Sequence, residues 1–383
     1  MPTRGSAAVI GVAESDLGQV AAGMTPADLM AQAVAAALSD CGISLRDVDA
    51  VFSAATQMNM PVLNLCEYLG IQPRYMDGTH IGGASFLSHV AHAQAALEAG
   101  ACRVAVIAYG STQRTAGRST AAPQEITPYE APYRPMHPVT AYALAASRHM
   151  AEFGTTREQL ASVAVAAREW ALMNPRAWEK KPLTLDQVLA APMIASPLTV
   201  RDCCLVTDGG GAIVMTSAKD ARRGSKEPVY VLGVGEASTH RHITGMPDLT
   251  QTAARLSGRR SFEMAGLGPR DVDVAELYDA FTINTILFLE DLGFCAKGEG
   301  GRFVEGGRIA PGGALPVNTN GGGLSYCHPG MFGIFTLIEA VRQIRGECGA
   351  RNVPGCEVAL AHGNGGVLSS QATVVLGSAA TVS

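Results

Sequence analysis

The segment that decides the fold reads His80-Ile-Gly-Gly-Ala-Ser-Phe-Leu-Ser-His-Val-Ala-His-Ala-Gln-Ala-Ala-Leu-Glu-Ala-Gly100, and the run Arg103-Val-Ala-Val-Ile-Ala-Tyr-Gly110 comes shortly after it. The first part contains a glycine turn and then an apolar pattern with helical spacing that stops at Gly100. The second part is a continuous apolar run, which is typical of a buried strand. A turn, a helix and a buried strand in this order predict an α/β protein whose largely parallel sheet is covered by helices.

The same alternation occurs in both halves of the chain. The first half shows a strand at 7–13, a helix from Thr25 to near Gly42 and a strand at 47–52; the second shows a strand at 229–235, a helix ending at 265, a strand at 271–275 and a helix at 281–292. Asp47-Val48-Asp49-Ala50 and Asp271-Val272-Asp273-Val274 occupy equivalent places in these two series. This internal duplication predicts two αβαβα halves that form a five-layered core.

We expect the N-terminal half to span 1–225 and the C-terminal half to span 226–383. Between about 111 and 205 the N-terminal half carries an insertion, with helical periodicity at 140–153 and 157–173. The proline-rich stretch from Ala122 to Pro138 predicts an extended loop, long enough to cover a site.

Bulk properties exclude several classes of protein. The chain has 383 residues, 47% of them hydrophobic, with 43 glycines and a formal net charge of -5. This charge leaves no basic footprint for nucleic acid. No apolar run approaches the roughly 20 residues of a membrane span, and the start lacks a signal-peptide profile, so we expect a cytoplasmic protein. The nine cysteines form no Cys-x-x-Cys pair, which predicts free, mostly buried thiols and no metal site.

Four further motifs carry a family resemblance. They are Arg201-Asp-Cys-Cys-Leu-Val-Thr-Asp-Gly-Gly-Gly-Ala212, Glu276-Leu-Tyr-Asp-Ala-Phe-Thr282, Asn320-Gly-Gly-Gly-Leu-Ser-Tyr-Cys-His-Pro-Gly330 and Ala361-His-Gly-Asn-Gly-Gly366. In this order, and spread over nearly the whole chain, they resemble motifs of the thiolase superfamily, in its sterol-carrier or lipid-transfer-protein branch. The segment from His80 to Gly110 resembles the nucleophile region of these proteins. The resemblance implies the thiolase fold.

The two cysteines that thiolases use are missing from this pattern. Counting back from Gly100 puts Gly83 at the position of the nucleophilic cysteine, and Gly363 stands where the second cysteine would be. Because glycine has no thiol, it cannot form an acyl-enzyme. The resemblance implies that the chain keeps a scaffold for acyl-CoA and lacks the covalent chemistry.

Three residues are candidate catalytic groups. Tyr278 stands where the family has an asparagine or a histidine, and a tyrosine there resembles the lipid-transfer-protein-type aldolases that cleave steroid side-chain CoA esters. His328 matches the histidine that faces the thioester in thiolases, and its position between a glycine-rich turn and an apolar helix predicts a helix N-terminus. His362, beside Gly363, is the titratable group near neutral pH at the second cysteine position. The alternative for each is a buried side chain with local hydrogen bonds.

The glycine clusters allow a backbone to approach a substrate closely. Asp279 could orient neighbouring groups or cap a strand end, Tyr326 could supply a second hydroxyl, and Cys327 is expected to be a packing residue. The predicted substrate-binding set comprises Gly82, Gly83, Ser85, Asp279, Gly322, Tyr326, Gly363, Asn364 and Gly365.

The resemblance implies a retro-aldol cleavage of a β-hydroxyacyl-CoA. Tyr278 would act as a base or proton relay, and His328 would bind the thioester oxygen. We expect no bound cofactor, because the CoA thioester is the substrate. Two alternatives stay open: an acetyl-CoA acyltransferase of the sterol-carrier type that uses a cysteine such as Cys327 or Cys66, and a non-catalytic acyl-CoA-binding subunit.

Two partners are also implied. We expect a homodimer that forms through the N-terminal half. The aldolases that the chain resembles work with a small subunit that carries a zinc ribbon and an oligosaccharide-binding-type fold, and such a partner would complete the wall of the tunnel. Neither nucleic acid nor a membrane is expected.

Overall fold

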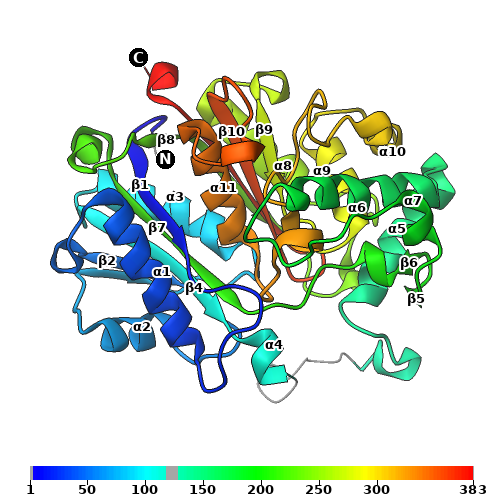
Figure 1. Cartoon of the computed structure of the whole chain (residues 1–383), viewed down its shortest axis with the longest axis horizontal. Helices are drawn as coiled ribbons and strands as arrows, with labels where there is room; N and C mark the ends of the chain where they lie inside the picture. Colours follow the sequence, from blue (N-terminus) through cyan, green and yellow to red (C-terminus); the bar gives the residue numbers. More distant parts are fainter. Residues whose placement is uncertain (1–2, 118–127, 383) are drawn as a thin grey trace.

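The computed structural model describes residues 3–117 and 128–382. Its main sheet has nine strands in the order β3-β2-β4-β7-β1-β8-β11-β10-β9, and β5 and β6 form a separate pair (Figure 1). The strands are β1 (Ala7–Glu14), β2 (Ala50–Ser53), β3 (Tyr75–Asp77), β4 (Val104–Ser111), β5 (Met193–Ala195), β6 (Leu198–Thr199), β7 (Gly209–Ser217), β8 (Val229–Ser238), β9 (Val274–Leu277), β10 (Val358–Gly365) and β11 (Ser370–Gly377).

The main sheet consists of two repeats of one pattern. In the first repeat β2 and β4 are parallel, while β7 and β1 follow in antiparallel pairings. In the second repeat β9 and β10 are parallel, and β11 and β8 follow in antiparallel pairings. The two repeats meet at β1 and β8, which share only the pairs Ala8–Tyr230 and Val9–Val229. The internal duplication predicted from the sequence is therefore confirmed.

Helices complete a five-layered arrangement. They are α1 (Pro26–Cys41), α2 (Pro61–Leu69), α3 (Ser85–Glu98), α4 (Gln113–Ala116), α5 (Val139–Phe153), α6 (Arg157–Leu172), α7 (Leu185–Leu189), α8 (Ala254–Ala265), α9 (Thr282–Asp291), α10 (Gly300–Phe303) and α11 (Gly333–Arg345). α1 packs on β1, β4 and β7, and α8 packs on β8 and β11. α3 and α11 each contact strands of both repeats, so they lie between the two halves of the main sheet and form the central one of the five layers. The predicted α/β fold is confirmed.

Local sequence explains where the elements begin and end. The Thr25 hydroxyl accepts a hydrogen bond from the Asp28 N–H, and the Asp28 carboxylate accepts one from the Thr25 N–H, which forms a capping box at the start of α1. Pro26 occupies the first turn, and Gly42 ends the helix with a φ of 69°, which favours glycine. These are the signals from which the helix was predicted.

The segment between β4 and β7 packs against the C-terminal half. α5 and α6 match the two predicted helices closely, and α6 contacts α9 and the turn at Gly322–Tyr326. Residues 118–127, which include the start of the predicted proline-rich loop, lie outside the described residues. The remainder is not extended throughout, because Ala131–Tyr133 forms a 3-10 turn. Proline at Pro132 is compatible with this turn, since its fixed φ suits a first helical turn.

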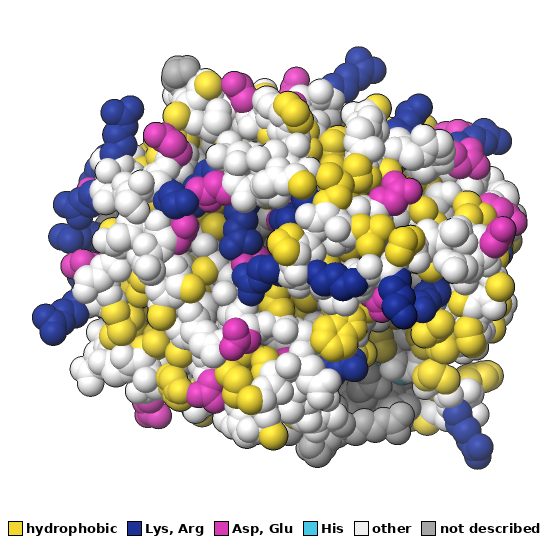
Figure 2. Space-filling view, viewed as in Figure 1, with side chains coloured by type: hydrophobic (Ala, Val, Ile, Leu, Met, Phe, Trp, Pro, Cys, Tyr) yellow, Lys and Arg dark blue, Asp and Glu magenta, His cyan; other side chains and the backbone are white. Residues whose placement is uncertain are grey.

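The surface carries a mixture of basic, acidic and apolar side chains, in agreement with the small net charge of -5. Figure 2 shows Lys and Arg side chains interspersed with acidic and apolar ones across one face of the molecule. Within the described ranges, every helix is too short or too polar to cross a membrane.

Candidate active site

Gly83 and Tyr278 meet at the centre of the molecule. Gly83 lies in the turn before α3, and Tyr278 follows β9 directly. A Cβ atom at Gly83 would lie 2.1 Å from Cε2 of Tyr278 and 2.8 Å from the carbonyl oxygen of Asn364. The Tyr278 ring therefore occupies the space into which a side chain at position 83 would project.

Tyr278 is paired with His328. The Tyr278 hydroxyl lies 3.1 Å from Nε2 of His328 and 3.3 Å from the carbonyl oxygen of Gly330. Both side chains are buried. Burial lowers the pKa of His328 to about 4 and raises the pKa of Tyr278 well above its usual range. At neutral pH a protonated phenol therefore lies against an uncharged imidazole, which has one nitrogen able to accept a proton.

His328 lies in a loop, not at a helix N-terminus as we expected. α11 begins only at Gly333, and Gly330 has a φ of 92°, a left-handed conformation that interrupts the helical path. The loop is held instead by Thr207, whose hydroxyl accepts a hydrogen bond of 2.9 Å from the His328 N–H. The helix dipole consequently has less influence on His328 than the sequence suggested.

Asp279 shapes the glycine-rich turn. Its carboxylate accepts hydrogen bonds from the N–H groups of Gly323 (2.6 Å) and Leu324 (3.3 Å). A Cβ atom at Gly322 would lie 2.1 Å from this carboxylate, and the Gly322 N–H donates to the Asn320 side chain. These amides are thus engaged within the protein. Burial raises the pKa of Asp279 to about 7.

Gly82, Ser85 and Gly365 join two turns beside this centre. The Ser85 hydroxyl donates to the carbonyl oxygen of Gly82 (2.7 Å) and accepts from the N–H of Ile81 (2.9 Å). Gly82 has a φ of 70°, and a Cβ atom there would lie 2.8 Å from the Cα atom of Gly365. Glycine at these predicted positions allows the turn before α3 and the end of β10 to touch.

The side chain of His362 does not reach Tyr278 and His328, although the His362 carbonyl oxygen accepts a hydrogen bond of 3.0 Å from the Tyr278 N–H. On β10 the His362 side chain faces the opposite side of the sheet from a Cβ at Gly363, which would meet Leu87 of the central layer. Both ring nitrogens of His362 are bonded to β11, to the hydroxyl of Thr373 (2.9 Å) and the amide oxygen of Gln371 (3.0 Å). Burial lowers its pKa to about 3.

Tyr326 also reaches elsewhere. Its hydroxyl donates to Glu14 (3.0 Å), a buried carboxylate that pairs with Arg176 and Arg342. Cys327, the next residue, is buried and its thiol pKa is raised by burial. Glu14 could not be recognised from the sequence, because its partners come from distant parts of the chain.

A further tyrosine was missed by the sequence analysis. Tyr142 on α5 donates a hydrogen bond of 3.1 Å to the Gly366 carbonyl oxygen and accepts one of 2.8 Å from the Asn364 amide. It comes from the insertion, and nothing in its local pattern distinguishes it from a packing residue. Asn364, a predicted substrate-binding residue, thus lies between Tyr142 and the turn at Gly83.

Tyr278 is almost fully enclosed. It is only 4% exposed, whereas Cys204 and Leu205 are half-buried and Gly366 is exposed. The Cys204 N–H donates to the carbonyl oxygen of Ala280, two residues from Tyr278. Gly82 and Gly330 are half-buried as well, so the surface comes near the centre on more than one side.

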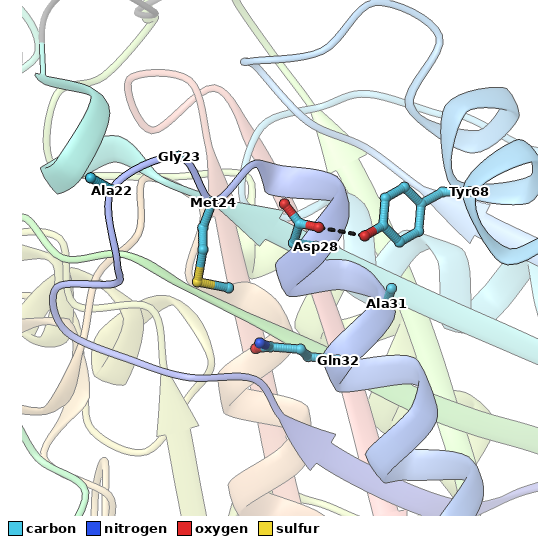
Figure 3. A pocket seen from close by; sticks show the side chains of 7 residues that line it. All are labelled: Ala22, Gly23, Met24, Asp28, Ala31, Gln32 and Tyr68. Carbon is cyan, nitrogen blue, oxygen red and sulfur yellow. Dashed lines mark hydrogen bonds between the residues drawn. The ribbon is translucent and has the colours of Figure 1, made fainter.

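Two surface pockets lie away from this group. Figure 3 shows the first, where the Asp28 carboxylate on α1 accepts a hydrogen bond from the Tyr68 hydroxyl on α2. The second is lined by the glycine-rich segment 305–314 and Glu169. Neither contains a residue of the predicted site.

The repeated halves and their glycine-lined centre define an α/β protein of the thiolase fold. Residues 235–378 match the family described as thiolase C-terminal domain-like. The chain is 36% identical to an acetyl-CoA acetyltransferase of Methanothermobacter thermautotrophicus (94% of this chain, 96% of the relative). It is 34% identical to a 17-hydroxy-3-oxo-4-pregnene-20-carboxyl-CoA lyase of Mycobacterium tuberculosis (96% and 98%).

A solved structure is similar over the whole chain. It is the Ltp2-ChsH2(DUF35) aldolase, with a TM-score of 0.88, 30% sequence identity and 99% coverage of both chains. These relatives share full-length similarity at or above 30% identity. The chain therefore belongs to the thiolase superfamily, as the motifs suggested.

Proposed function

We propose that this protein cleaves a carbon–carbon bond in a β-hydroxyacyl-CoA by a retro-aldol reaction, without a covalent intermediate. One observation carries the proposal: the ring of Tyr278 fills the space above Gly83, and its hydroxyl lies 3.1 Å from His328. A proton-transfer pair thus stands where a thiolase nucleophile would project. The full-length similarity to a lyase and an aldolase supports this assignment.

Tyr278 and His328 can take one proton from the substrate and later return it. The β-hydroxyl of the substrate donates its proton to the Tyr278 oxygen while the phenol proton passes to Nε2 of His328. The Cα–Cβ bond then breaks, which leaves a ketone or aldehyde and the enolate of a shorter acyl-CoA. The enolate takes the proton back at Cα through Tyr278. The atoms balance without a co-reactant.

This scheme changes one expected role. We expected His328 to bind the thioester oxygen, but its contact with Tyr278 favours the role of proton acceptor. Because burial keeps the imidazole neutral, His328 can accept a proton at neutral pH. We assign the closely packed backbone at Gly82, Gly83 and Gly365 to the substrate thioester. His362 and Tyr326 are left out of the chemistry, because both are bonded to other parts of the protein.

The direct test is cleavage of a panel of β-hydroxyacyl-CoA esters. Purified protein should convert at least one of them into a shorter acyl-CoA and a carbonyl compound, both detected by chromatography and mass spectrometry. The Tyr278→Phe variant should lose this activity. Cleavage at an unchanged rate in the variant would exclude the assigned mechanism.

The acyltransferase alternative is favoured by the similarity to an acetyl-CoA acetyltransferase. It requires a reactive thiol, and burial raises the thiol pKa of both Cys327 and Cys66. An acyl adduct on either cysteine would support it. A non-catalytic acyl-CoA-binding subunit would bind CoA esters without turnover and would be indifferent to Tyr278→Phe.

We propose two protein partners. The first is a second copy, paired through β3, because β3 is an edge strand of the main sheet and carries the exposed side chain of Met76. The second is a small subunit with a zinc ribbon and an oligosaccharide-binding-type fold, since the similar aldolase structure is a complex with ChsH2 (DUF35). Light scattering of the protein alone, and activity with and without a small protein of this type such as ChsH2, test these assignments. A cytoplasmic location remains a prediction.

A further inference from the structure

Asn284 presents a buried amide that the described protein atoms do not satisfy. The residue lies in the first turn of α9 and is fully buried. Neither its Nδ2 nor its Oδ1 atom has a hydrogen-bond partner among the described residues. An unpaired buried donor or acceptor costs roughly 1–3 kcal/mol, so a group of this kind needs an explanation. A molecule that supplies both a donor and an acceptor would satisfy it.

Tyr142 borders the turn of α9 that carries this amide. The Tyr142 ring stacks on Phe281, with ring centroids 4.3 Å apart, so its position is fixed. The backbone N–H of Asn284 donates a hydrogen bond of 3.0 Å to the carbonyl oxygen of Phe281, so both side chains border the same turn of α9. The Tyr142 hydroxyl itself is engaged within the protein, because it donates to Gly366 and accepts from Asn364.

This pair of groups borders the proposed reaction centre. The Asn364 amide bonds to Tyr142, and the Asn364 carbonyl oxygen lies 2.8 Å from where a Cβ of Gly83 would be. Burial raises the pKa of Tyr278, and ionisation of Cys204 or Tyr142 would raise it further, so all three side chains share one environment. Cys204 is half-buried, and Gly366, whose carbonyl oxygen accepts the hydrogen bond from Tyr142, is exposed, so this environment borders the surface.

The chemistry of the pair selects a class of ligand group. Asn284 offers an N–H donor and a C=O acceptor, and the fixed Tyr142 ring borders them. A hydroxyl group, which donates one hydrogen bond and accepts another, matches this set, whereas a ketone could use only the donor. The immediate partners Tyr142, Asn284 and Asn364 carry no charge, and burial raises the pKa of the Cys204 thiol, so it stays protonated. A carboxylate or phosphate would find no cation among these four side chains.

We propose that Asn284 and Tyr142 form a subsite that binds a hydroxyl group on the acyl part of a CoA ester, separate from the hydroxyl that reacts at Tyr278. The subsite rests on the proposed function, because it takes the acyl-CoA as the ligand. It would make the protein selective for acyl chains that are hydroxylated at a second carbon. A site built to bond a hydroxyl rejects a ligand without it, because its own buried polar groups are then left unpaired.

Binding of matched esters tests the subsite independently of cleavage. The probes are hexanoyl-CoA and its 4-hydroxy and 5-hydroxy derivatives, which have no β-hydroxyl and cannot undergo the retro-aldol step. Calorimetric titration should show at least one hydroxylated ester binding about tenfold more tightly than hexanoyl-CoA, the effect of roughly two neutral hydrogen bonds. Asn284→Leu should bring this ratio close to one and leave the affinity for hexanoyl-CoA nearly unchanged.

Two further variants complete the test. Tyr142→Phe should also reduce the ratio. Thr285→Val removes a buried hydroxyl from the next position of α9, about 100° around the helix from Asn284, and should leave the ratio intact. A ratio of one in the wild type, a ratio that survives Asn284→Leu, or an equal loss in Thr285→Val would overturn the subsite. Absence of binding by every ester would overturn it too.

The two proposals fail in different ways. A preference for the hydroxylated ester together with no cleavage of any β-hydroxyacyl-CoA would support the subsite and contradict the retro-aldol activity. Cleavage without any preference among the three probes would support the activity and contradict the subsite.

Discussion

The Tyr278 ring and the Cα atom of Gly83 are so close that a Cβ at position 83 would lie 2.1 Å from Cε2 of the ring. Gly83 has no left-handed φ, so the backbone itself would accept another residue. The requirement for glycine therefore comes mainly from the tyrosine, and also from the Asn364 carbonyl oxygen, which would lie 2.8 Å from the same Cβ. Within the thiolase fold these two positions are linked: a chain with the tyrosine has no space for a side chain at the nucleophile position.

Gly83→Ala should consequently destabilise the protein and displace Tyr278. Inserting a methyl group into a packed centre costs roughly 1–3 kcal/mol, and chemical denaturation should show a loss of this size. Gly245→Ala is the matched control, since its Cβ would lie 3.6 Å from the nearest atom and its φ is ordinary. Equal stability of the two variants would contradict the steric link between Gly83 and Tyr278.

Tyr278→Phe removes only the hydroxyl that lies beside His328. If this hydroxyl relays the proton, kcat should fall by roughly 10²–10⁴-fold, the usual range for general acid–base catalysis. The ring remains, so its packing over Gly83 and the KM should change little. Steady-state kinetics on a cleaved β-hydroxyacyl-CoA measure this. A rise in KM at constant kcat would assign the hydroxyl to binding instead.

Much of the fold could be predicted because its signals are local. Thr25, Pro26 and Gly42 mark the ends of α1, and the repeated order of elements around Asp47 and Asp271 indicated the duplication. The start of α11 was misplaced because Gly330, with a φ of 92°, lies within the loop and the helix begins only at Gly333. Apolar spacing alone does not distinguish a helical turn from the residues just before it.

The site was predictable only where a motif marked it. Tyr278 and His328 lie in motifs, and the structure brings them together. His362 lies in a motif as well, but strand alternation turns its side chain to the opposite face from Gly363. Tyr142 and Asn284 had no motif, and their proximity depends on how α5 packs against α9. Tertiary contacts of this kind are not encoded in any one segment.

The protein should form no acyl adduct. All nine cysteines are free in the structure, but burial raises the thiol pKa of Cys66, Cys204 and Cys327, and position 83 is a glycine. Intact-mass spectrometry after incubation with acetyl-CoA and longer acyl-CoA esters should show the unmodified mass. An adduct that peptide mapping places on a cysteine would contradict this prediction and support the acyltransferase function.

The rate should remain high well below the usual pKa of histidine. His328 must be neutral to accept the proton, and burial lowers its pKa to about 4, so kcat/KM should fall only as the pH approaches that value. A loss of rate with an apparent pKa near 6.5 would contradict the buried, neutral state. A change near pH 7 that disappears in Asp279→Asn would instead belong to that carboxyl, whose pKa is about 7.

His362 should control acid stability rather than catalysis. Burial lowers its pKa from 6.5 to about 3, so between these values the unfolded chain binds a proton that the folded chain does not. Stability therefore rises with pH across this window and is lost as the pH falls from about 6.5 toward 3.

His362→Gln keeps a donor and an acceptor for Gln371 and Thr373 but cannot be protonated, so it should flatten the dependence of the melting temperature on pH. His328 has the same direction of shift, so some dependence should remain. At pH 8, where the wild-type imidazole is neutral in both states, the variant should melt close to the wild type and retain its kcat. An unchanged slope would show that protonation of His362 does not control acid stability, and a large loss of kcat at pH 8 would show that His362 has the catalytic role that its motif suggested.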